Sequence, residues 1–395
     1  MFKKLTLEDL DVKGKRVLVR VDFNIPLDTK GEITDDLRIT TALPTIRYIS
    51  DNHGKAILMS HLGRPKGKVQ DDKRLTPVSK RLSRLLGKEV KKMPDCVGAE
   101  VKEAIFKMKE GDIILLENLR FHIEEEKNDP TFSKELASLG DLYVNDAFAV
   151  SHRKHASTFG VPRLFPQAAA GFLLKQEVEY LDRVNNPDRP FVAIIGGAKV
   201  STKVPIIKNL LKKVDTLIIG GGMAYTFLKA LGRPIGHSLV EDDMVDVAKD
   251  ILIMSIADEV PILYPIDHLI ATSMSTDAQT KIVHRGGILE DWYGVDVGPL
   301  TIKKFIDCLK GAKTILWNGP LGICEIDRFS KGTRELANFI AASNALSIVG
   351  GGDSSAFVIK EGLFDKMTHV STGGGACLQF LAGEELPGIS ILTDK

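Results

Sequence analysis

Short apolar segments alternate along the chain with longer segments whose apolar residues recur at helical spacing. The apolar segments are almost continuous runs of Val, Ile, Leu and Ala, which is typical of strands buried on both faces of a parallel sheet. Helical spacing is clear between them, for example at 76–86 and 330–341. This alternation predicts an α/β fold with parallel sheets flanked by helices. We expect strands at residues 16–23, 56–60, 113–119, 142–147, 191–196, 216–221, 262–271, 314–318 and 346–350.

A chain of 395 residues is too long for one ordinary hydrophobic core and favours two domains. An amphipathic segment at 171–190 contains Asn-Asn-Pro near its end and divides the apolar pattern into two halves. We therefore expect a first domain at 1–172, a connecting helix and linker at 173–189, and a second domain at 190–379.

The overall composition is that of an ordinary soluble globular protein, with 44% hydrophobic and 27% charged residues. A net charge of +1 argues against a broad nucleic-acid-binding surface. The charge is uneven, because residues 1–172 carry about +5 and residues 173–395 about −4. Positive charge in the first half suits an anionic small molecule, although a chance fluctuation explains the asymmetry equally well.

The four cysteines are widely spaced and form no Cys-x-x-Cys pair, which indicates buried thiols in a reducing compartment rather than disulfides or a zinc site. The N-terminal residues contain no apolar core of signal-peptide length. The apolar, uncharged stretch 216–228 is interrupted by three glycines and is too short to span a bilayer. We therefore expect a cytoplasmic enzyme without membrane partners.

Polar and basic residues follow four of the expected strands in the first half. In open parallel sheets ligands bind at the carboxyl ends of strands, so these residues converge on one edge. A lone arginine there is usually a surface ion pair, but several guanidinium forks together favour a multiply charged anion. A carboxylate and an amide beside them would suit a hydroxyl, so the set fits a small, hydroxylated, phosphorylated carboxylic acid. The residues are Asp22, Asn24, His61, Arg64, Arg120 and Arg153, with Arg38 early in the first crossover helix.

Five glycine-rich loops lie in the second half, and four of them are at the ends of expected strands. Glycine lets the backbone approach a ligand closely, and free N–H groups at a helix start favour phosphate. One such loop is weak evidence, because strand-to-helix turns need glycine anyway, but five in one domain indicate a nucleotide or polyphosphate site. The loops lie at 196–197, 220–222, 318–322, 350–352 and 373–375.

The segment GGAKVSTK at 196–203 is the most phosphate-like of these loops. It lacks the Gly-x-x-x-x-Gly-Lys-Ser/Thr pattern of a P-loop, and no Gly-x-Gly-x-x-Gly with a suitable acidic residue indicates a nicotinamide site. Lys199 and Lys203 are four residues apart, so on a helix they would share one face. The segment is therefore either a phosphate site of another design or a basic helix start.

Two acidic residues accompany the glycine loops. Asp353 is the best magnesium candidate, because Mg²⁺ keeps several waters and needs few carboxylates. A role as a helix N-cap is equally compatible with its position and does not exclude metal binding. Glu325 could accept hydrogen bonds from a ribose.

Ten segments resemble, in order, motifs of the phosphoglycerate kinase family, and they extend from residue 19 to residue 376. They are VRVDFNIP, ITDDLRI, SHLGRP, LLENLRF, VNDAFAVSHRKHAS, GGAKVSTK, GGGMAYTFL, WNGPLG, GGGDSSA and HVSTGGGA. The resemblance implies two Rossmann-like domains that close by bending at a hinge, with residues 380–395 packing back on the first domain. It also implies a monomer that transfers a phosphoryl group reversibly from 1,3-bisphosphoglycerate to ADP, giving 3-phosphoglycerate and Mg-ATP.

The family motifs also imply a role for individual residues. For phosphoglycerate binding they imply Asp22, Phe23, Asn24, Arg38, His61, Leu62, Gly63, Arg64, Arg120 and Arg153. For nucleotide binding they imply Gly197, Lys199, Lys203, Gly221, Gly294, Asn318, Pro320, Glu325, Gly351, Gly352, Asp353 and Ser354, with Asp353 near Mg²⁺. Arg38, Lys203 and the backbone at Gly374 are the expected catalytic groups. Ala149, Ser354 and Gln379 depart from residues common in the family without removing an expected contact.

The expected reaction agrees with the absence of any nucleophile–base arrangement in the sequence. A phosphate oxygen of ADP and a substrate carboxylate are both ionised near neutral pH, so neither needs a general base. Catalysis would then depend on in-line positioning and charge neutralisation. Two alternatives remain open from the sequence: a non-catalytic protein that closes over an anion, and another acyl-phosphate or carboxylate kinase.

Overall fold

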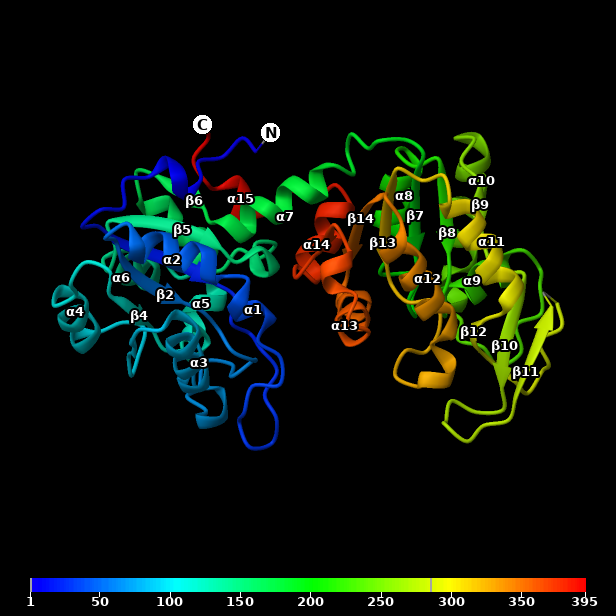
Figure 1. Ribbon diagram of the computed structural model, residues 1–395, viewed down its shortest axis with the longest axis horizontal. Helices are drawn as coiled ribbons and strands as arrows, with labels where there is room; N and C mark the ends of the chain where they lie inside the picture. The colour runs from blue at the N-terminus through cyan, green and yellow to red at the C-terminus, as the bar shows by residue number, and fades with distance from the viewer. Residues whose placement is uncertain (1, 285) are drawn as a thin grey trace. The chain divides into compact units, whose positions relative to one another are not determined.

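A computed structural model describes residues 2–284 and 286–395 (Figure 1). The chain forms two compact units, one of Met1–Glu179 with Glu385–Lys395 and the other of Tyr180–Glu384. Each unit contains a six-stranded parallel sheet, as the apolar pattern predicts.

The sheet of the first unit has the strand order β3-β4-β2-β1-β5-β6, and all its pairings are parallel. Both faces are buried, because neighbouring residues of β1 such as Val17 and Leu18 belong to separate hydrophobic clusters. The strands are β1 (Arg16–Val21), β2 (Lys55–Met59), β3 (Val90–Lys92), β4 (Ile113–Leu115), β5 (Leu142–Asp146) and β6 (Ala168–Ala170). Because every strand runs the same way, all carboxyl ends meet at one edge.

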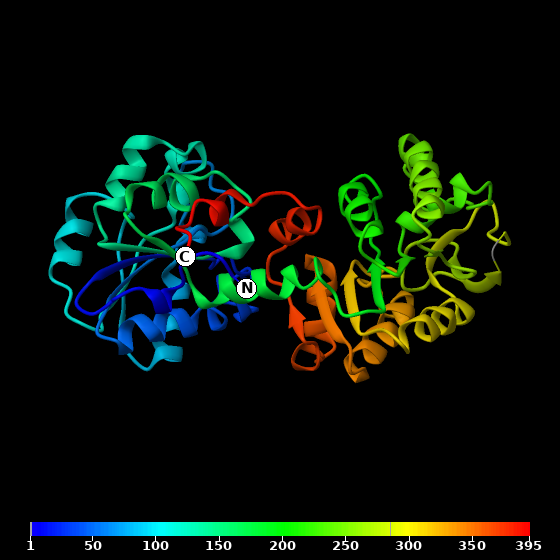
Figure 2. The same cartoon turned by 90° about the horizontal axis from the view of Figure 1, so that it is seen from above.

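Helices cover both faces of this sheet. Apolar residues of α2 and α3 pack in one cluster, and those of α4 and α6 pack in the other (Figure 2). The helices are α1 (Leu37–Thr40), α2 (Leu43–Asp51), α3 (Thr76–Leu86), α4 (Ala99–Phe106), α5 (Ile123–Lys127), α6 (Pro130–Ala137) and α15 (Pro387–Ser390), and α7 (Phe172–Asp182) begins in this unit and ends in the second. The predicted helix at 76–86 coincides with α3, which has Pro77 in its first turn and ends at Gly87 with φ +67°.

The two ends of the chain lie side by side in the first unit (Figure 2). The backbone N–H of Leu5 donates to the carbonyl of Thr393 at 2.8 Å, and that of Gly388 donates to the carbonyl of Ser151 at 2.8 Å. The last residues are thereby held against the loop that follows β5.

The main sheet of the second unit has the order β15-β14-β13-β7-β8-β9 and is also parallel. Helices α11, α12 and α13 pack on one face through a cluster that contains Trp317, while α8, α9, α10 and α14 contact one another. The strands are β7 (Phe191–Ile195), β8 (Thr216–Ile219), β9 (Ile262–Leu263), β13 (Thr314–Asn318), β14 (Leu346–Gly350) and β15 (His369–Val370). The helices are α8 (Val204–Leu211), α9 (Met223–Ala230), α10 (Val245–Ala257), α11 (Pro299–Leu309), α12 (Lys331–Ala342), α13 (Gly352–Lys360) and α14 (Gly375–Leu381).

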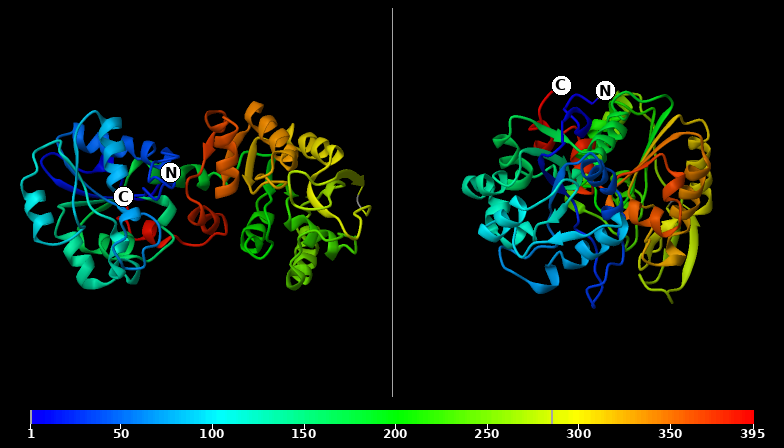
Figure 3. Two further views of the ribbon diagram at one scale, coloured as in Figure 1. Left: turned by 90° about the horizontal axis from the view of Figure 1, so that it is seen from below. Right: turned by 60° about the vertical axis from the view of Figure 1, so that its left-hand side comes forward.

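A separate three-stranded antiparallel sheet corrects the prediction of one strand at 262–271. The segment forms two strands in different sheets, β9 and β10 (Asp267–Ala271), because Pro265 between them has no backbone N–H for a ladder. β10 pairs with β11 (Thr280–His284) and β12 (Tyr293–Val297), shown in yellow and yellow-green in Figure 3. The sequence pattern did not predict β3, β6, β11, β12 or β15.

The structure also corrects the expectation that GGAKVSTK forms the start of a helix. α8 begins only at Val204, and residues 201–203 form a turn whose last member, Lys203, is the N-cap. Lys199 and Lys203 therefore do not share a helix face. Among the described residues, no helix is long and apolar enough to cross a membrane.

Candidate active site

The end of β1 carries a charged pair that is held by the end of β2. Arg38, from α1, forms an ion pair with the buried carboxylate of Asp22. Asn24 accepts a hydrogen bond from the backbone N–H of Gly63 at 2.8 Å. The backbone N–H of Phe23 donates to the hydroxyl of Ser60 at 2.8 Å. These contacts join two neighbouring strand ends and leave the Asn24 amide half-exposed.

His61 lies buried at the end of β2, surrounded by arginines. Burial lowers its pKa well below the ordinary 6.5, and the charges of Arg20, Arg120, Arg38 and Arg153 lower it further. The imidazole is therefore neutral at physiological pH. Four guanidinium groups near one buried ring outnumber the carboxylates of Asp22, Glu125 and Glu126 beside them, and this excess of positive charge suits an anion.

Arg120 follows β4 and has a donor that the described residues leave unused. Its Nη1 donates to the carbonyl of Gly63 at 2.9 Å, and its Nε lies 3.3 Å from a carboxylate oxygen of Glu126. Its Nη2 is buried and has no hydrogen-bond partner among the described residues. Burial, with Arg153 and Arg20 nearby, lowers the pKa of Arg120 to about 10. A buried, unsatisfied donor of this kind is expected where an anionic ligand binds.

Asn118 holds this part of the site together, and the sequence reasoning did not identify it. Its amide donates to the carbonyls of Leu62 and Lys73 at 2.8 and 2.9 Å, and its oxygen accepts from the N–H of Arg120. The sequence feature that could have identified Asn118 is its position inside the motif LLENLRF. Of the remaining predicted residues, Arg153 is half-buried after β5 and Arg64 is exposed after β2.

The second unit contains a cavity of about 440 Å³. Apolar side chains that the sequence reasoning missed, including Tyr225, Leu239 and Val295, form part of its wall. The predicted nucleotide residues that line it are Gly197, Gly221, Gly294, Pro320, Glu325 and Asp353. A mostly apolar cavity with two carboxylates near its rim is suited to a flat ring system that carries polar substituents.

Two glycines are required by the geometry of this cavity. Gly221 has φ +67°, and a Cβ there would lie 2.5 Å from the backbone nitrogen of Gly197. A Cβ at Gly294 would lie 2.6 Å from Cε1 of Tyr225 and closer still to its hydroxyl. Any side chain at either position would therefore displace the wall.

The other predicted nucleotide residues, among them Lys199, Lys203 and Ser354, do not belong to the lining of the cavity. The ammonium of Lys203 donates to the amide oxygen of Asn318, and burial lowers the pKa of Lys203. Ser354 accepts a hydrogen bond from the N–H of Gly319 at 2.6 Å. Asp353, which does line the cavity, lies in the first turn of α13, which starts at Gly352. Lys199 is exposed.

The start of α14 presents the last glycine loop. Gly374 is its N-cap, with φ +49°, and the helix begins at Gly375. Gly351 has the same role before α13, with φ +90°. At each of these helix starts the first backbone N–H groups have no preceding turn of the helix whose carbonyls could accept their hydrogen bonds.

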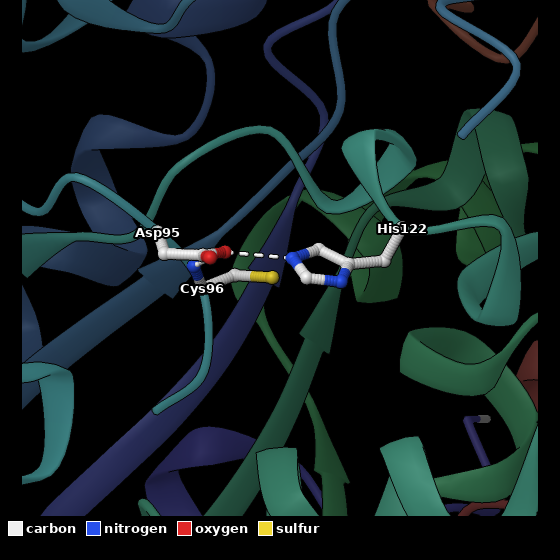
Figure 4. A group of neighbouring side chains, drawn as sticks. All are labelled: Asp95, Cys96 and His122. Carbon is white, nitrogen blue, oxygen red and sulfur yellow. Dashed lines mark hydrogen bonds and ion pairs between the residues drawn. The ribbon is translucent and has the colours of Figure 1, made fainter. Parts of the chain in front are cut away.

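Asp95, Cys96 and His122 form a group of potential metal ligands whose donor atoms lie within 4.8 Å of one another. Figure 4 shows the Cys96 sulfur directed toward the His122 ring. One Asp95 oxygen already accepts hydrogen bonds from His122 at 2.7 Å and from the N–H of Cys96 at 2.6 Å. Burial raises the pKa of the Cys96 thiol well above 9.0, which keeps the sulfur protonated. Hydrogen bonds that connect the segments around Asp95 and His122 therefore explain this group, and we assign it no metal.

An electropositive strand edge in one α/β unit and a glycine-lined cavity in a second unit define a two-domain phosphotransferase. The family model described as "Phosphoglycerate kinase" matches residues 7–384. The chain belongs to the phosphoglycerate kinase family. This family transfers a phosphoryl group reversibly between 1,3-bisphosphoglycerate and ADP, a step of glycolysis.

Curated relatives and solved structures agree with this assignment over nearly the whole chain. The chain is 57% identical to phosphoglycerate kinase of Dictyoglomus turgidum, over 99% of this chain and 98% of that protein. It is 54% identical to that of Moorella thermoacetica, over 99% and 100% of the two chains. The structure of phosphoglycerate kinase from Coxiella burnetii superposes with a TM-score of 0.90 at 43% identity, over 98% of both chains. That from Pyrococcus horikoshii superposes with a TM-score of 0.85 at 34% identity, over 98% of both.

Proposed function

We propose that the first unit binds 3-phosphoglycerate and 1,3-bisphosphoglycerate and that the second unit binds ADP and ATP. The observation that carries this proposal is the pairing of clustered arginines in one unit with a glycine-lined cavity of about 440 Å³ in the other. A protein that only closed over an anion would need one of these sites. The pairing therefore favours a kinase over a simple binding protein.

The strand ends of the first unit offer complementary groups for phosphoglycerate. The unsatisfied Nη2 of Arg120 can donate to a phosphate or carboxylate oxygen of the substrate. The half-buried Arg153 supplies a second guanidinium for these oxygens. Asp22 and Asn24 supply a carboxylate and an amide for the substrate hydroxyl. The proposed ligands are Asp22, Phe23, Asn24, Arg38, His61, Leu62, Gly63, Arg64, Arg120 and Arg153.

The cavity of the second unit is proposed to take the adenosine, with Glu325 accepting from the ribose hydroxyls. The phosphates would lie toward Lys203 and the N–H groups at the start of α13. The proposed nucleotide ligands are Gly197, Lys199, Lys203, Gly221, Gly294, Asn318, Pro320, Glu325, Gly351, Gly352, Asp353 and Ser354.

We propose that Asp353 holds Mg²⁺ together with the nucleotide phosphates. One exposed carboxylate at the cavity rim fits Mg²⁺, which keeps several waters and takes its other oxygens from phosphate. When bound, the ion supplies positive charge that screens the phosphate oxygens during transfer.

In the ATP-forming direction, a terminal phosphate oxygen of ADP attacks the phosphorus of the acyl phosphate. A new P–O bond forms to ADP, the P–O bond to the carboxyl oxygen breaks, and the carboxylate leaves as an anion. No proton moves, so no base is required. Arg38, Lys203 and the N–H groups at Gly374 are proposed to stabilise the charge on the transferred group. Asp22 orients Arg38, and Asn318 orients Lys203, before any substrate binds.

The two substrates are assigned to different units, so transfer requires the units to bring them together. We propose closure about the segment 171–190 and the loop near 373, which would also exclude water from the reacting groups. We further propose that the enzyme is a cytoplasmic monomer. Each proposed site is built from one chain, and the four cysteines are free, as in a reducing compartment.

Steady-state kinetics with a panel of carboxylic acids test this function. We expect ADP formation from Mg-ATP with 3-phosphoglycerate and little with acetate or the unphosphorylated acid, since neither offers the arginines a phosphate. Folded protein that binds 3-phosphoglycerate and ATP without turnover would support a binding protein instead. Faster turnover with acetate would identify a different carboxylate kinase.

A further inference from the structure

Arg20 is a charged residue inside the most buried part of the first sheet. It lies in β1, and its side chain is 1% exposed. Its Nε donates to the hydroxyl of Ser157 at 2.8 Å, and its Nη1 donates to the carbonyl of Val21. Its Nη2 lies 3.2 Å from Nδ1 of His61. All three nitrogens bond within the protein, and because the side chain is almost fully buried we do not assign Arg20 as a direct ligand for substrate.

The contact between Arg20 and His61 determines where the imidazole proton lies. A guanidinium has only donors, so Nδ1 of His61 must accept this hydrogen bond. The ring is neutral, because it is buried among Arg20, Arg38, Arg120 and Arg153. The carboxylate of Asp22 lies 3.9 Å from Nδ1, which is too far for it to accept a proton from that nitrogen. The single ring proton is thus on Nε2.

Arg20 is itself held by a second buried pair. The Ser157 hydroxyl donates to one carboxylate oxygen of Glu125 at 2.6 Å, and the Ser157 N–H donates to the other at 2.9 Å. The hydroxyl oxygen is then free to accept from Arg20. Glu125 is 1% exposed and Ser157 is 0% exposed. Tyr143, also buried, donates to the Ser157 carbonyl at 2.8 Å and fixes this loop.

We propose that Glu125, Ser157 and Arg20 are positioning residues that hold His61 as the neutral Nε2–H tautomer. In this form Nε2 presents a fixed donor to a carboxylate or phosphate oxygen of phosphoglycerate. The other tautomer would offer that oxygen a lone pair and repel it. The direction of each hydrogen bond in the series follows from Arg20, which can only donate. The inference deepens the proposed function, because it assumes that the first unit binds phosphoglycerate.

The tautomer can be observed without any substrate. In protein with ¹⁵N-labelled histidine, long-range ¹H–¹⁵N spectra separate the protonated from the unprotonated ring nitrogen. The chain has nine histidines, so the His61→Asn variant assigns the signal. We expect His61 to be neutral with its proton on Nε2. A proton on Nδ1, or a charged ring near pH 7, would overturn the proposal.

The Ser157→Ala variant tests the positioning role, because it removes the hydroxyl that hydrogen-bonds both Glu125 and Arg20. We expect a mixture of His61 tautomers and a rise of about tenfold in KM for 3-phosphoglycerate, with KM for ATP unchanged. Ser157→Thr, which keeps the hydroxyl, should restore both the single His61 tautomer and the KM for 3-phosphoglycerate of the unaltered protein. Ser133→Ala is a matched control, because Ser133 is another buried serine whose hydroxyl bonds the Asp129 carbonyl.

The possible results separate this inference from the proposed function. A folded Ser157→Ala variant with unaltered tautomer and KM would overturn the positioning role. If that variant does not fold, Glu125→Gln tests the same link, and unaltered values there would be equally decisive. Absence of turnover in the unaltered protein, with His61 still the Nε2–H tautomer, would instead contradict the proposed function.

Discussion

Replacing Gly294 with alanine tests whether the cavity of the second unit is the nucleotide site. Gly294 lies in β12, opposite Ile270 of β10, and its N–H donates to the Ser238 hydroxyl at 2.9 Å. A Cβ there would lie 2.6 Å from Cε1 of Tyr225, where ordinary contacts begin at 3.4 Å. Tyr225 is 5% exposed and packs against Leu228 and Ile270, so its ring can move away from the new methyl only toward the cavity that it lines.

The added methyl must therefore move either the Tyr225 ring or the strand, and both line the cavity. Overpacking of this kind costs about 1–3 kcal/mol. If that cost falls on the nucleotide-bound state, KM for ATP should rise about 5- to 150-fold. KM for 3-phosphoglycerate should not change, because its proposed ligands belong to the other unit.

Coupled steady-state assays give both KM values, and calorimetric titration with ADP gives the affinity directly. Gly311→Ala is the matched control, because Gly311 is exposed and a Cβ there meets nothing within 4 Å. A folded Gly294→Ala enzyme with the KM for ATP and the ADP affinity of the control would refute the assignment of this cavity.

Three further predictions concern charged groups. Arg38→Ala should lower kcat about 10³-fold or more, because the variant loses a guanidinium proposed to stabilise the transferred phosphoryl group. Near-normal kcat of this variant in a steady-state assay would exclude that role. Lys203→Ala should lower kcat and weaken ADP binding measured by calorimetry, whereas unchanged values for both would identify Lys203 as structural. Burial raises the pKa of Asp296 from 3.8 to about 7 in the folded protein, so the unfolded chain loses this proton first as pH rises. The contribution of this group to the free energy of unfolding should therefore fall as pH rises from about 4 to 7. Urea titrations over this pH range should show a smaller fall in the free energy of unfolding for Asp296→Asn than for the unaltered protein. An equal fall in the two proteins would contradict the raised pKa of Asp296.

Most of the sheet architecture could be predicted from the sequence because its strands are buried on both faces. The strands β13 and β14 lie at the predicted residues, and the carboxyl ends of four predicted strands meet at one edge of the first unit. The small antiparallel sheet was missed, because β11 is short and mostly exposed and therefore lacks a continuous apolar run. Periodicity also could not locate the start of α8, where a turn separates Lys199 from the helix.

Sequence reasoning proposed residues for the two candidate sites but did not identify the buried polar side chains that support them. Arg20, Ser157 and Glu125 are far apart along the chain and are brought together only by the tertiary fold. One signal was available, since Arg20 interrupts the apolar run RVLVRV. A charge inside a strand buried on both faces needs a partner. The partner's identity cannot be read from a single sequence, because Glu125 and Ser157 belong to helical segments that follow other strands of the sheet.

Trapping the acyl phosphate is the most direct test of the proposed function. Hydroxylamine converts an acyl phosphate to a hydroxamate, so the reaction of 3-phosphoglycerate, Mg-ATP and enzyme can be followed in its presence. We expect one hydroxamate for each ADP formed, and neither product without 3-phosphoglycerate. ADP formation without hydroxamate, or no reaction by folded protein, would contradict transfer to the carboxylate.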